Sequence, residues 1–431
     1  MRIPELLIPA GDMEKMRYAF AFGADAVYLG IPRFSLRARE NGFKDVAQVA
    51  EAVAYAHRLG RKVYVTANIL SHNSKVPGFI RLVKDICSAC KPDAWIMADP
   101  GLIMLMREHF PSEAIHISVQ SNVINYASAK FWQNIGASRI ILSREISIAE
   151  MKVIRDACPG LELESFVHGA VCIAYSGRCL ISNYLTHRDS NQGVCTNSCR
   201  WQYKVAKTKH GDDYVPLKDE FYLEESERKG MLFPIEEDEH GAYLMNAKDL
   251  CAIRCLGELQ AAGIGAFKVE GRSKTVYYIA MVTRAYRRAI DDLVKGQPFN
   301  EEHMSDIFAT SARGFTEGFL HGDPGPGAVE YSNSNSAYSG YRFTGIVRGY
   351  DQIKKMLKVE PRNPIKCGQA YELCLPDRNV ALEVKELFDD KGHSVSAIHG
   401  GLHFCYIPFP QDPGEFVLLR EQILRSSSHT S

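Results

Sequence analysis

The octapeptide LELESFVH, residues Leu161–His168, decides the fold class of this chain. Read as a strand, it has one apolar face, and its opposite face carries Glu162, Glu164, Phe166 and His168. Strands of an open, doubly wound parallel sheet are buried on both faces and read as continuous apolar runs. A strand with one polar face instead suits a closed barrel with a functional interior and an outer ring of helices. We therefore predict a TIM-like (β/α)8 barrel, with the doubly wound sheet as the alternative.

Seven further segments have the spacing that such a barrel needs. They are Glu5–Ile8, Ala26–Gly30, Lys62–Asn68, Ala94–Asp99, Ala114–Gln120, Arg139–Glu145 and Ala266–Gly271. The early segments start about 20 to 36 residues apart, which accommodates a strand, a crossover helix and two loops. The last two strands start 105 residues apart, about 70–80 residues more than one unit needs. This excess predicts an insertion over residues 170–245 at the carboxyl-terminal face of the barrel, where active sites lie.

The chain is predicted to fold as two domains, which makes the fold class α/β with a small C-terminal all-β domain. Residues 1–320 are expected to form the barrel and its insertion. Directly after the insertion, Asn246 is expected to cap a helix. Residues 321–339 are rich in Gly, Pro, Ser and Asn and predict a linker. Residues 340–425 contain short alternating runs split by turn residues, which predicts a β-barrel-like domain.

Composition limits the class of protein. The chain has 431 residues, 51 Lys+Arg and 51 Asp+Glu, and its hydrophobic (46%) and charged (24%) fractions exclude wholesale disorder. No apolar run approaches the ~20 residues that span a bilayer, and Pro4 and Pro9 interrupt the N-terminal segment, so we expect a cytoplasmic protein. Nucleic-acid-binding domains often have a pI above ~9, whereas this chain has a pI near 7.2. A nucleic-acid substrate would therefore require a local basic patch.

Four of the twelve cysteines lie close together within the insertion. They are Cys172, Cys179, Cys195 and Cys199, with the spacing C-x6-C-x15-C-x3-C. Four thiolates that converge on one point bind either tetrahedral zinc or an iron–sulfur cluster. Structural zinc sites usually have short C-x2–4-C pairs, so this spacing favours a larger cluster wrapped by a loop. The alternative is four unrelated buried cysteines, because free cysteine often packs as a small apolar side chain.

Two other groups of residues are expected to have structural roles. Further cysteines should pack in the core, namely Cys87, Cys90, Cys251, Cys255, Cys367, Cys374 and Cys405. The predicted helix Thr275–Lys295 carries Arg284, Arg287 and Arg288, which we expect on a solvated face.

Polar side chains follow several predicted strands at the same end of the barrel. The candidates are Gln120, His168, Lys268, Glu270 and Arg272. The run Arg33, Arg37 and Arg39 follows the second strand, and three guanidinium groups could grip a carboxylate or a phosphate. These residues could serve substrate binding or acid–base chemistry. The alternatives are ion pairs inside the barrel and a solvated loop.

Common hydrolase and phosphate-binding motifs do not occur in the sequence. Ser176 lacks the G-x-S-x-G context of a nucleophile elbow, and no H-E-x-x-H zinc motif is present. The chain also has no Walker or G-x-G-x-x-G phosphate loop.

The seventh strand and the cysteine segment together resemble a known family. The pattern Glu164-x-Phe166-x-x-Gly169-Ala170-Val171-Cys172-x4-Gly177-x-Cys179-x-Ile181-Ser182 matches the signature of the collagenase-like peptidase family U-32. Other matching stretches are Pro4–Gly11, Gly23–Tyr28, Asp99–Leu105, Gln192–Asn197 and Gly314–Phe319. The resemblance runs from Pro4 to about Phe319 and continues more weakly through the C-terminal β domain.

The resemblance is close to one branch of this family, whose members modify tRNA. It implies a barrel with a 4Fe–4S cluster that forms 5-hydroxyuridine at the tRNA wobble position, with prephenate as co-substrate and without oxygen. The four cysteines of the insertion match the ligand positions of that branch, and Cys199 is the least fixed, because some relatives take one ligand from elsewhere. The implied partner is the tRNA anticodon loop, whose single-stranded bases can be splayed into a pocket.

With this function in view, the polar residues at the barrel end become candidates for specific roles. Catalysis is expected from His168, Lys268 and Glu270. Substrate binding is expected from Arg33, Arg37, Arg39, Gln120 and Arg272, with prephenate carboxylates or RNA phosphates as ligands of the arginine run. Other functions stay open: a hydroxylase of ribosomal RNA or of a quinone precursor, a peptidase, and a non-catalytic scaffold that carries a cluster.

Overall fold

The computed structural model divides the chain into two compact units. It describes residues 3–36, 41–172, 174–200, 206–210, 213–216, 221–224, 232–238, 241–243, 248–310, 314–322, 340–401 and 403–423. The first unit consists of Met1–Met16, Asp25–Ser273 and Arg313–Ala337. The second consists of Arg17–Ala24, Lys274–Ala312 and Tyr338–Ser431. Among the described residues, no helix has the length and apolar character needed to cross a membrane.

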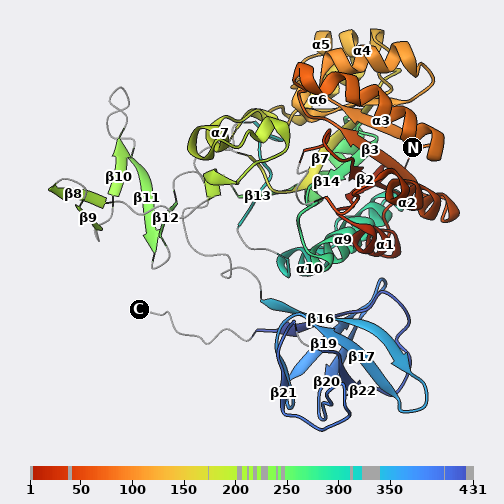
Figure 1. Ribbon diagram of the computed structural model, residues 1–431, viewed down its shortest axis with the longest axis vertical. Coiled ribbons are helices and arrows are strands. Elements are labelled where there is room, and N and C mark those ends of the chain that lie inside the picture. The colour runs from red at the N-terminus through yellow and green to blue at the C-terminus, as the bar shows by residue number, and fades with distance from the viewer. Residues whose placement is uncertain are drawn as a thin grey trace. The chain divides into compact units, whose positions relative to one another are not determined.

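A closed parallel barrel forms the core of the first unit (Figure 1). Its strands are β1 (Glu5–Pro9), β2 (Ala26–Gly30), β3 (Lys62–Ala67), β4 (Ala94–Met97), β5 (Ile115–Ile117), β6 (Arg139–Ile141), β7 (Glu162–Gly169) and β14 (Ala266–Val269). Neighbouring strands pair in sequence order, and β14 closes the ring by pairing in parallel with both β7 and β1. The predicted barrel is therefore confirmed, and the open doubly wound sheet is excluded.

Helices follow the strands, as in a (β/α)8 chain. They are α1 (Met13–Ala21), α2 (Val46–Arg58), α3 (Val76–Ala89), α4 (Pro100–His109), α5 (Tyr126–Asn134), α6 (Ile148–Ala157) and α8 (Leu256–Ala261). Side-chain caps fix several of their starts. Asp45 accepts a hydrogen bond from the amide of Gln48, and Ser147 forms a capping box with Glu150. These caps satisfy amides that have no partner within the helix.

The insertion leaves from β7, the longest barrel strand. Its first part contains α7 (Ile181–Thr186), and its second contains β8 (Ala206–His210), β9 (Asp213–Pro216), β10 (Phe221–Glu224), β11 (Leu232–Asp238) and β12 (Gly241–Tyr243). The chain then returns as β13 (Asp249–Cys251), which pairs antiparallel with the end of β7 and parallel with β15 (Phe315–Thr316). The prediction of a helix that starts after Asn246 is therefore wrong for Asp249–Cys251, which form a strand because the projecting end of β7 offers them backbone hydrogen-bond partners. Asn246 itself lies outside the described residues.

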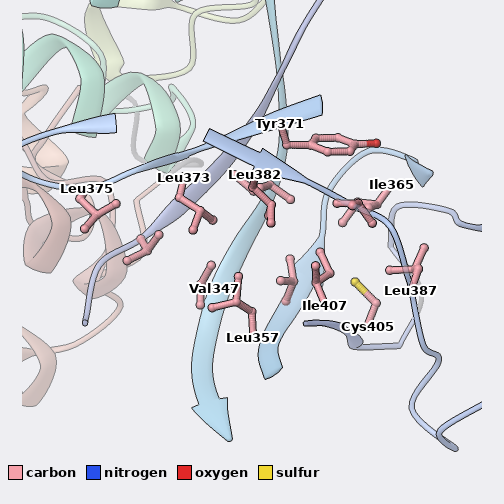
Figure 2. Packing of buried hydrophobic residues seen from close by; sticks show 14 residues of the cluster. Val347, Leu357, Ile365, Tyr371, Leu373, Leu375, Leu382, Leu387, Cys405 and Ile407 are labelled. Atoms are coloured by element: carbon pink, nitrogen blue, oxygen red, sulfur yellow. The ribbon is translucent and has the colours of Figure 1, made fainter. Parts of the chain in front are cut away.

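The second unit contains an antiparallel β domain. Its main sheet has the order β20-β19-β23-β16-β17-β22. These strands are β16 (Tyr341–Asp351), β17 (Met356–Pro361), β19 (Ala370–Cys374), β20 (Asn379–Glu383), β22 (Cys405–Pro408) and β23 (Leu418–Gln422), and a separate pair is formed by β18 (Ile365–Lys366) and β21 (Ala397–Ile398). Figure 2 shows Val347, Leu357, Leu373 and Ile407 pointing into one buried cluster. The predicted C-terminal all-β domain is confirmed.

Two helices, α9 (Val276–Val294) and α10 (Met304–Phe308), belong to the same compact unit as this β domain. Arg284 of α9 forms a bidentate ion pair with Asp306, at 2.7 Å from Nε to Oδ2 and 2.6 Å from Nη2 to Oδ1. Its guanidinium also donates to Leu375 O at 2.6 Å and to Asn379 Oδ1 at 2.8 Å. Both charged side chains are 2% exposed. The expectation that Arg284 lies on a solvated face is wrong, because α9 packs that residue against the β domain.

We expect Arg284→Ala to lower the free energy of unfolding by about 3–5 kcal/mol, because it removes the bidentate partner of the buried Asp306 and leaves that carboxylate, among the described residues, only Arg420, 3.6 Å away. Urea unfolding of the full chain measures the change. Arg288→Ala is the matched control, since Arg288 donates to Asp377 O from an exposed position and should cost about 1 kcal/mol. Equal losses for the two variants would contradict a central role for the Arg284 ion pair.

Candidate functional site

A pocket opens at the carboxyl-terminal ends of the barrel strands. Its cavity volume is about 130 Å³. The polar and charged side chains that line it come from six strands or the turns that follow them: Tyr28, Thr66, Asn68, Ser118, Gln120, Arg144, Glu145, Cys172, Ser176, Lys268, Glu270 and Arg272. This position is the one that active sites of such barrels occupy.

A ladder of buried ion pairs lies inside the barrel, below the pocket. Arg139, 2% exposed, contacts three carboxylates: Glu5 at 2.7 Å, Glu162 at 2.9 Å and Glu164 at 2.9 Å. Burial alone would raise the pKa of Glu5, but Arg139 and Lys62 outweigh it and hold that pKa below its ordinary value. Charged side chains therefore lie inside this barrel together with a cluster of buried apolar side chains.

Lys268 continues the ladder into the pocket. Its Nζ donates to Glu164 Oε1 at 2.8 Å, and it lies 4.4 Å from the centre of the Tyr28 ring and 5.5 Å from that of Phe166. Burial lowers the pKa of Lys268, although Glu164 opposes this by favouring the charged form. A lysine in this setting can donate a hydrogen bond, stabilise developing negative charge or exchange a proton.

Glu270 and Arg272 form one side of the rim. The Tyr28 hydroxyl lies 2.9 Å from Val269 O and 3.1 Å from Glu270 Oε2. Arg272, 7% exposed, donates to Thr66 Oγ1 at 3.3 Å and also to Leu36 O. A Cβ atom on Gly30 would lie 2.7 Å from Arg272 Nη1, so the absence of a side chain at the end of β2 makes room for this guanidinium.

Gln120 lies on the opposite side of the rim, in a single helical turn after β5. Its Oε1 accepts hydrogen bonds from Asn68 Nδ2 at 3.1 Å and from the Ser118 hydroxyl. Its backbone carbonyl accepts from Arg178 Nε at 3.1 Å. Gln120 is therefore held both by the barrel and by the insertion, and it is only 5% exposed.

Arg144 and Glu145, at the end of β6, are pocket residues that the sequence reasoning missed. Arg144 Nη1 donates to Ala170 O at 2.9 Å, and its guanidinium lies 4.0 Å from the centre of the Phe166 ring. Glu145 Oε1 accepts from the amide of Ser176 at 2.7 Å. The signal was available, because both residues follow a strand at the same barrel end as Lys268 and Arg272.

The first part of the insertion, residues 170–200, is tied to the barrel mouth at several points; we call it the cysteine segment. Ser176 contacts the Glu145 carboxylate, and its hydroxyl lies 2.8 Å from that of Ser143. Farther along, Gln192 accepts from Lys75 Nζ at 3.0 Å and donates to Leu70 O. The segment therefore contacts the strand ends of β3, β5 and β6.

Hydroxyl groups join the two halves of the cysteine segment. The Ser182 hydroxyl lies 3.0 Å from that of Thr196, whose Oγ1 is in turn 2.6 Å from Ser198 Oγ. The carbonyl of Cys179 accepts from Ser190 Oγ at 2.6 Å and from Asn191 Nδ2 at 3.1 Å. These contacts bring the stretch that carries Cys179 beside the stretch that carries Cys195 and Cys199.

The four cysteines of the segment differ in environment from the core cysteines. Cys172 lines the pocket and is exposed, as is Cys195, whereas Cys179 and Cys199 are partly exposed. The amide of Asn197 donates to Cys195 Sγ at 3.3 Å. By contrast, the structure buries Cys158, Cys251, Cys255, Cys374 and Cys405. None of the twelve cysteines, all of which lie among the described residues, forms a disulfide, so the segment offers soft sulfur donors at the pocket edge.

The structure places the other predicted site residues as follows. Lys268, Glu270, Arg272, Gln120 and Cys172 line the pocket. His168 does not, because a register shift beside Val269 turns it toward Phe315, whose ring centre lies 5.6 Å away. Arg33 is exposed and is not among the residues that line the pocket. Arg37 and Arg39 lie outside the described residues.

We expect Glu164→Gln to lower the free energy of unfolding by about 3 kcal/mol or more, since it takes a carboxylate from two buried cations, Lys268 and Arg139. Glu162→Gln is the control, because Glu162 is 21% exposed and pairs with Arg139 alone among these cations. It should cost about 1 kcal/mol. Urea unfolding compares the two, and a Glu164→Gln variant as stable as the control would show that the ladder does not stabilise the barrel.

Known proteins of one family match this chain over nearly its full length. The model of "Peptidase family U32" matches residues 11–330, and that of "Peptidase family U32 C-terminal domain" matches residues 339–420. A Haemophilus influenzae protein named "tRNA hydroxylation protein P" is 41% identical over 99% of this chain and 97% of its own length. The Escherichia coli protein of the same name is 42% identical over 95% of this chain and 94% of its own length. A second Escherichia coli protein, "23S rRNA 5-hydroxycytidine C2501 synthase", is 33% identical over 74% of this chain and 46% of its own length.

Proposed function

We propose that this chain, which belongs to peptidase family U32, is a cytoplasmic enzyme that hydroxylates the wobble uridine of tRNA at C5. The observation that carries the proposal is the pocket at the barrel mouth, which combines three cations, a glutamine and a cysteine of the anchored segment. Two relatives named as tRNA hydroxylation proteins match nearly the full chain. We further propose prephenate as co-substrate and a reaction without oxygen, as the resemblance of the sequence implies.

The cysteine segment fits a 4Fe–4S cluster. Its four thiols form no disulfide, are at least partly exposed and are soft ligands. Hydrogen bonds hold the stretch that carries Cys179 beside the stretch that carries Cys195 and Cys199. An amide that donates to Cys195 Sγ is the kind of contact that tunes the sulfur ligands of such clusters. Cys172, Cys179, Cys195 and Cys199 would hold the cluster, which would supply the electron transfer that unaided side chains perform poorly.

Arg144 and Arg272 are the proposed ligands of the co-substrate carboxylates. Both guanidinium groups line the pocket, and a guanidinium binds a carboxylate through two parallel hydrogen bonds. The prediction that RNA phosphates bind to Arg33, Arg37 and Arg39 stays a prediction. A protein of zero net charge must bind these phosphates through a local basic patch.

The uracil base is proposed to lie between the two sides of the rim. The Gln120 side-chain nitrogen can donate to a carbonyl of uracil, since its Oε1 already accepts from Asn68 and Ser118. Glu270 and Lys268 are the proposed acid–base pair: Glu270 Oε2 would exchange a proton with the substrate, and the ammonium of Lys268 would stabilise negative charge on it. The catalytic role of His168 stays a prediction, since its ring lies against Phe315.

Hydroxylation of ribosomal RNA is the second candidate, favoured by the similarity to the cytidine synthase of Escherichia coli, of which the chain spans less than half. A peptidase is less well supported, because no histidine occurs among the described residues that line the pocket to activate Ser176 or Cys172.

Deletion of the gene should remove 5-hydroxyuridine-derived nucleosides from bulk tRNA, and the wild-type gene should restore them. Variants with Ser at Cys172, Cys179, Cys195 or Cys199 should fail to restore them and should lose iron, whereas wild type purified without oxygen should hold about four iron and four sulfide per chain. Cys87→Ser, on helix α3, is the control and should behave as wild type. Unchanged tRNA nucleosides in a strain without a redundant enzyme, with loss of a modified rRNA nucleoside instead, would favour the second candidate.

Arg272→Lys and Arg144→Lys should each raise the KM for prephenate by about 10–100-fold, because lysine cannot form the bidentate contact worth ~1.5–3 kcal/mol. Steady-state kinetics with purified tRNA measures this change. Arg33→Lys is the control and should leave that KM unchanged. A raised KM for prephenate in Arg33→Lys alone would contradict this assignment and would indicate that the prephenate carboxylates bind to the arginine run instead.

A further inference from the structure

A second group of metal-binding side chains lies outside the pocket, where β13 and β15 come together. Cys255 and Glu258 are three residues apart at the start of α8, and Glu317 and His321 are four residues apart after β15. One donor atom each of Cys255, Glu258 and His321 lies within 4.8 Å of the others. Glu317 Oε2 lies 3.5 Å from His321 Nε2. Two segments about sixty residues apart thus bring four donors together.

The distances match those between ligands of one small cation. Cys255 Sγ lies 3.6 Å from His321 Nε2. In a tetrahedral zinc site with Zn–S ≈ 2.3 Å and Zn–N ≈ 2.0–2.1 Å, sulfur and nitrogen are about 3.6 Å apart, and nitrogen and a carboxylate oxygen about 3.4 Å apart. The other ring nitrogen, His321 Nδ1, is 3.9 Å from Glu258 Oε2, and one Glu258 oxygen lies within 4.8 Å of donor atoms of both Cys255 and His321.

The donor set combines two carboxylates with an imidazole and a buried thiol. Two carboxylates face a sulfur that is itself a poor hydrogen-bond partner, and Cys255 is 2% exposed. A divalent ion would neutralise the carboxylates and bind the thiolate directly.

A Cys–His–Glu set can also belong to a cysteine hydrolase, but the surroundings disfavour that reading. Cys255 is 2% exposed, whereas an activated nucleophile must be accessible to its substrate. Cys255 also lies outside the set of residues that line the described pockets.

We propose that Cys255, Glu258, Glu317 and His321 form a structural site for a zinc-class divalent cation, separate from the cysteine segment. Sulfur, imidazole and carboxylate are the donors that zinc accepts, and a closed four-ligand set is typical of a structural site. The cation would clamp α8 to the turn after β15. Since β13 pairs with both β15 and the end of β7, the clamp would hold the return point of the insertion.

The test uses the full-length protein with its iron content restored and measured separately. Zinc and cobalt are titrated against a chromophoric chelator into wild type, Cys255→Ser, His321→Ala and Glu258→Gln. Cys251→Ser is the matched control, because Cys251 is a buried cysteine four residues earlier, in strand β13, that is not part of the donor set. His321 and Glu258 are 50% and 60% exposed, so their variants keep the test valid if Cys255→Ser fails to fold.

Wild type and Cys251→Ser should bind about one more zinc per chain than Cys255→Ser. They should also show a thiolate-to-cobalt charge-transfer band that Cys255→Ser lacks. Loss of His321 should weaken zinc binding more than about 100-fold, because mutation of a group that only hydrogen-bonds to a metal ligand already lowers metal affinity by about 10–100-fold. Zinc should also raise the thermal midpoint of wild type but not of His321→Ala. Equal zinc binding by wild type and the ligand variants would overturn the proposal, as would rapid alkylation of Cys255 that zinc does not slow.

Discussion

The interior of the barrel depends on one buried carboxylate, Glu164. Its side chain is fully buried, with one oxygen 2.8 Å from Lys268 Nζ and the other 2.9 Å from Arg139 Nη1. Because an unpaired charge in this environment would cost several kcal/mol, the three side chains must keep their positions together. The pair fixes the ammonium of Lys268 beneath the pocket and between two aromatic rings. The polar floor of the pocket is thus part of the structure that holds the strands together.

A chain of zero net charge can still present a cationic site, because the charges are distributed unevenly. Arg144, Lys268 and Arg272 line the pocket together with two carboxylates, Glu145 and Glu270. The Lys268 charge is already balanced by Glu164 below, and Glu145 is engaged with Ser176 of the cysteine segment. Arg144 and Arg272 are the two remaining cations of the pocket, which is why they are the proposed ligands of a small anionic co-substrate.

Much of the fold and part of the site could be predicted from the sequence, for identifiable reasons. Strand parity at Leu161–His168 and the long gap before Ala266 suffice for the barrel and its insertion, and the rule that strand ends converge places Gln120, Lys268 and Arg272 correctly. The sequence pattern predicts one strand over Arg139–Glu145, whereas β6 ends at Ile141. Arg144 therefore lies in the turn after the strand, where the alternation of side chains no longer applies, and it lines the pocket.

Other outcomes required the three-dimensional structure. His168 has the parity of a pocket residue, but the register shift beside Val269 breaks that parity. The burial of Arg284 depends on strands that follow it by about ninety residues, and the donor pair Cys255 and His321 is separated by sixty-six residues with no spacing signal.

The projecting end of β7 has a consequence for how this protein can diversify. Since β13 pairs with Gly169 and His168, the excursion between them starts and ends on a hydrogen-bonded ribbon beyond the barrel rim. The entropy of closing such a loop grows only slowly, by about 0.6 kcal/mol for each doubling of its length. Residues can therefore be gained or lost in the distal hairpins at little thermodynamic cost to the barrel. The hydrogen-bonded ribbon therefore allows the length of the insertion to change while the pocket below it stays unchanged.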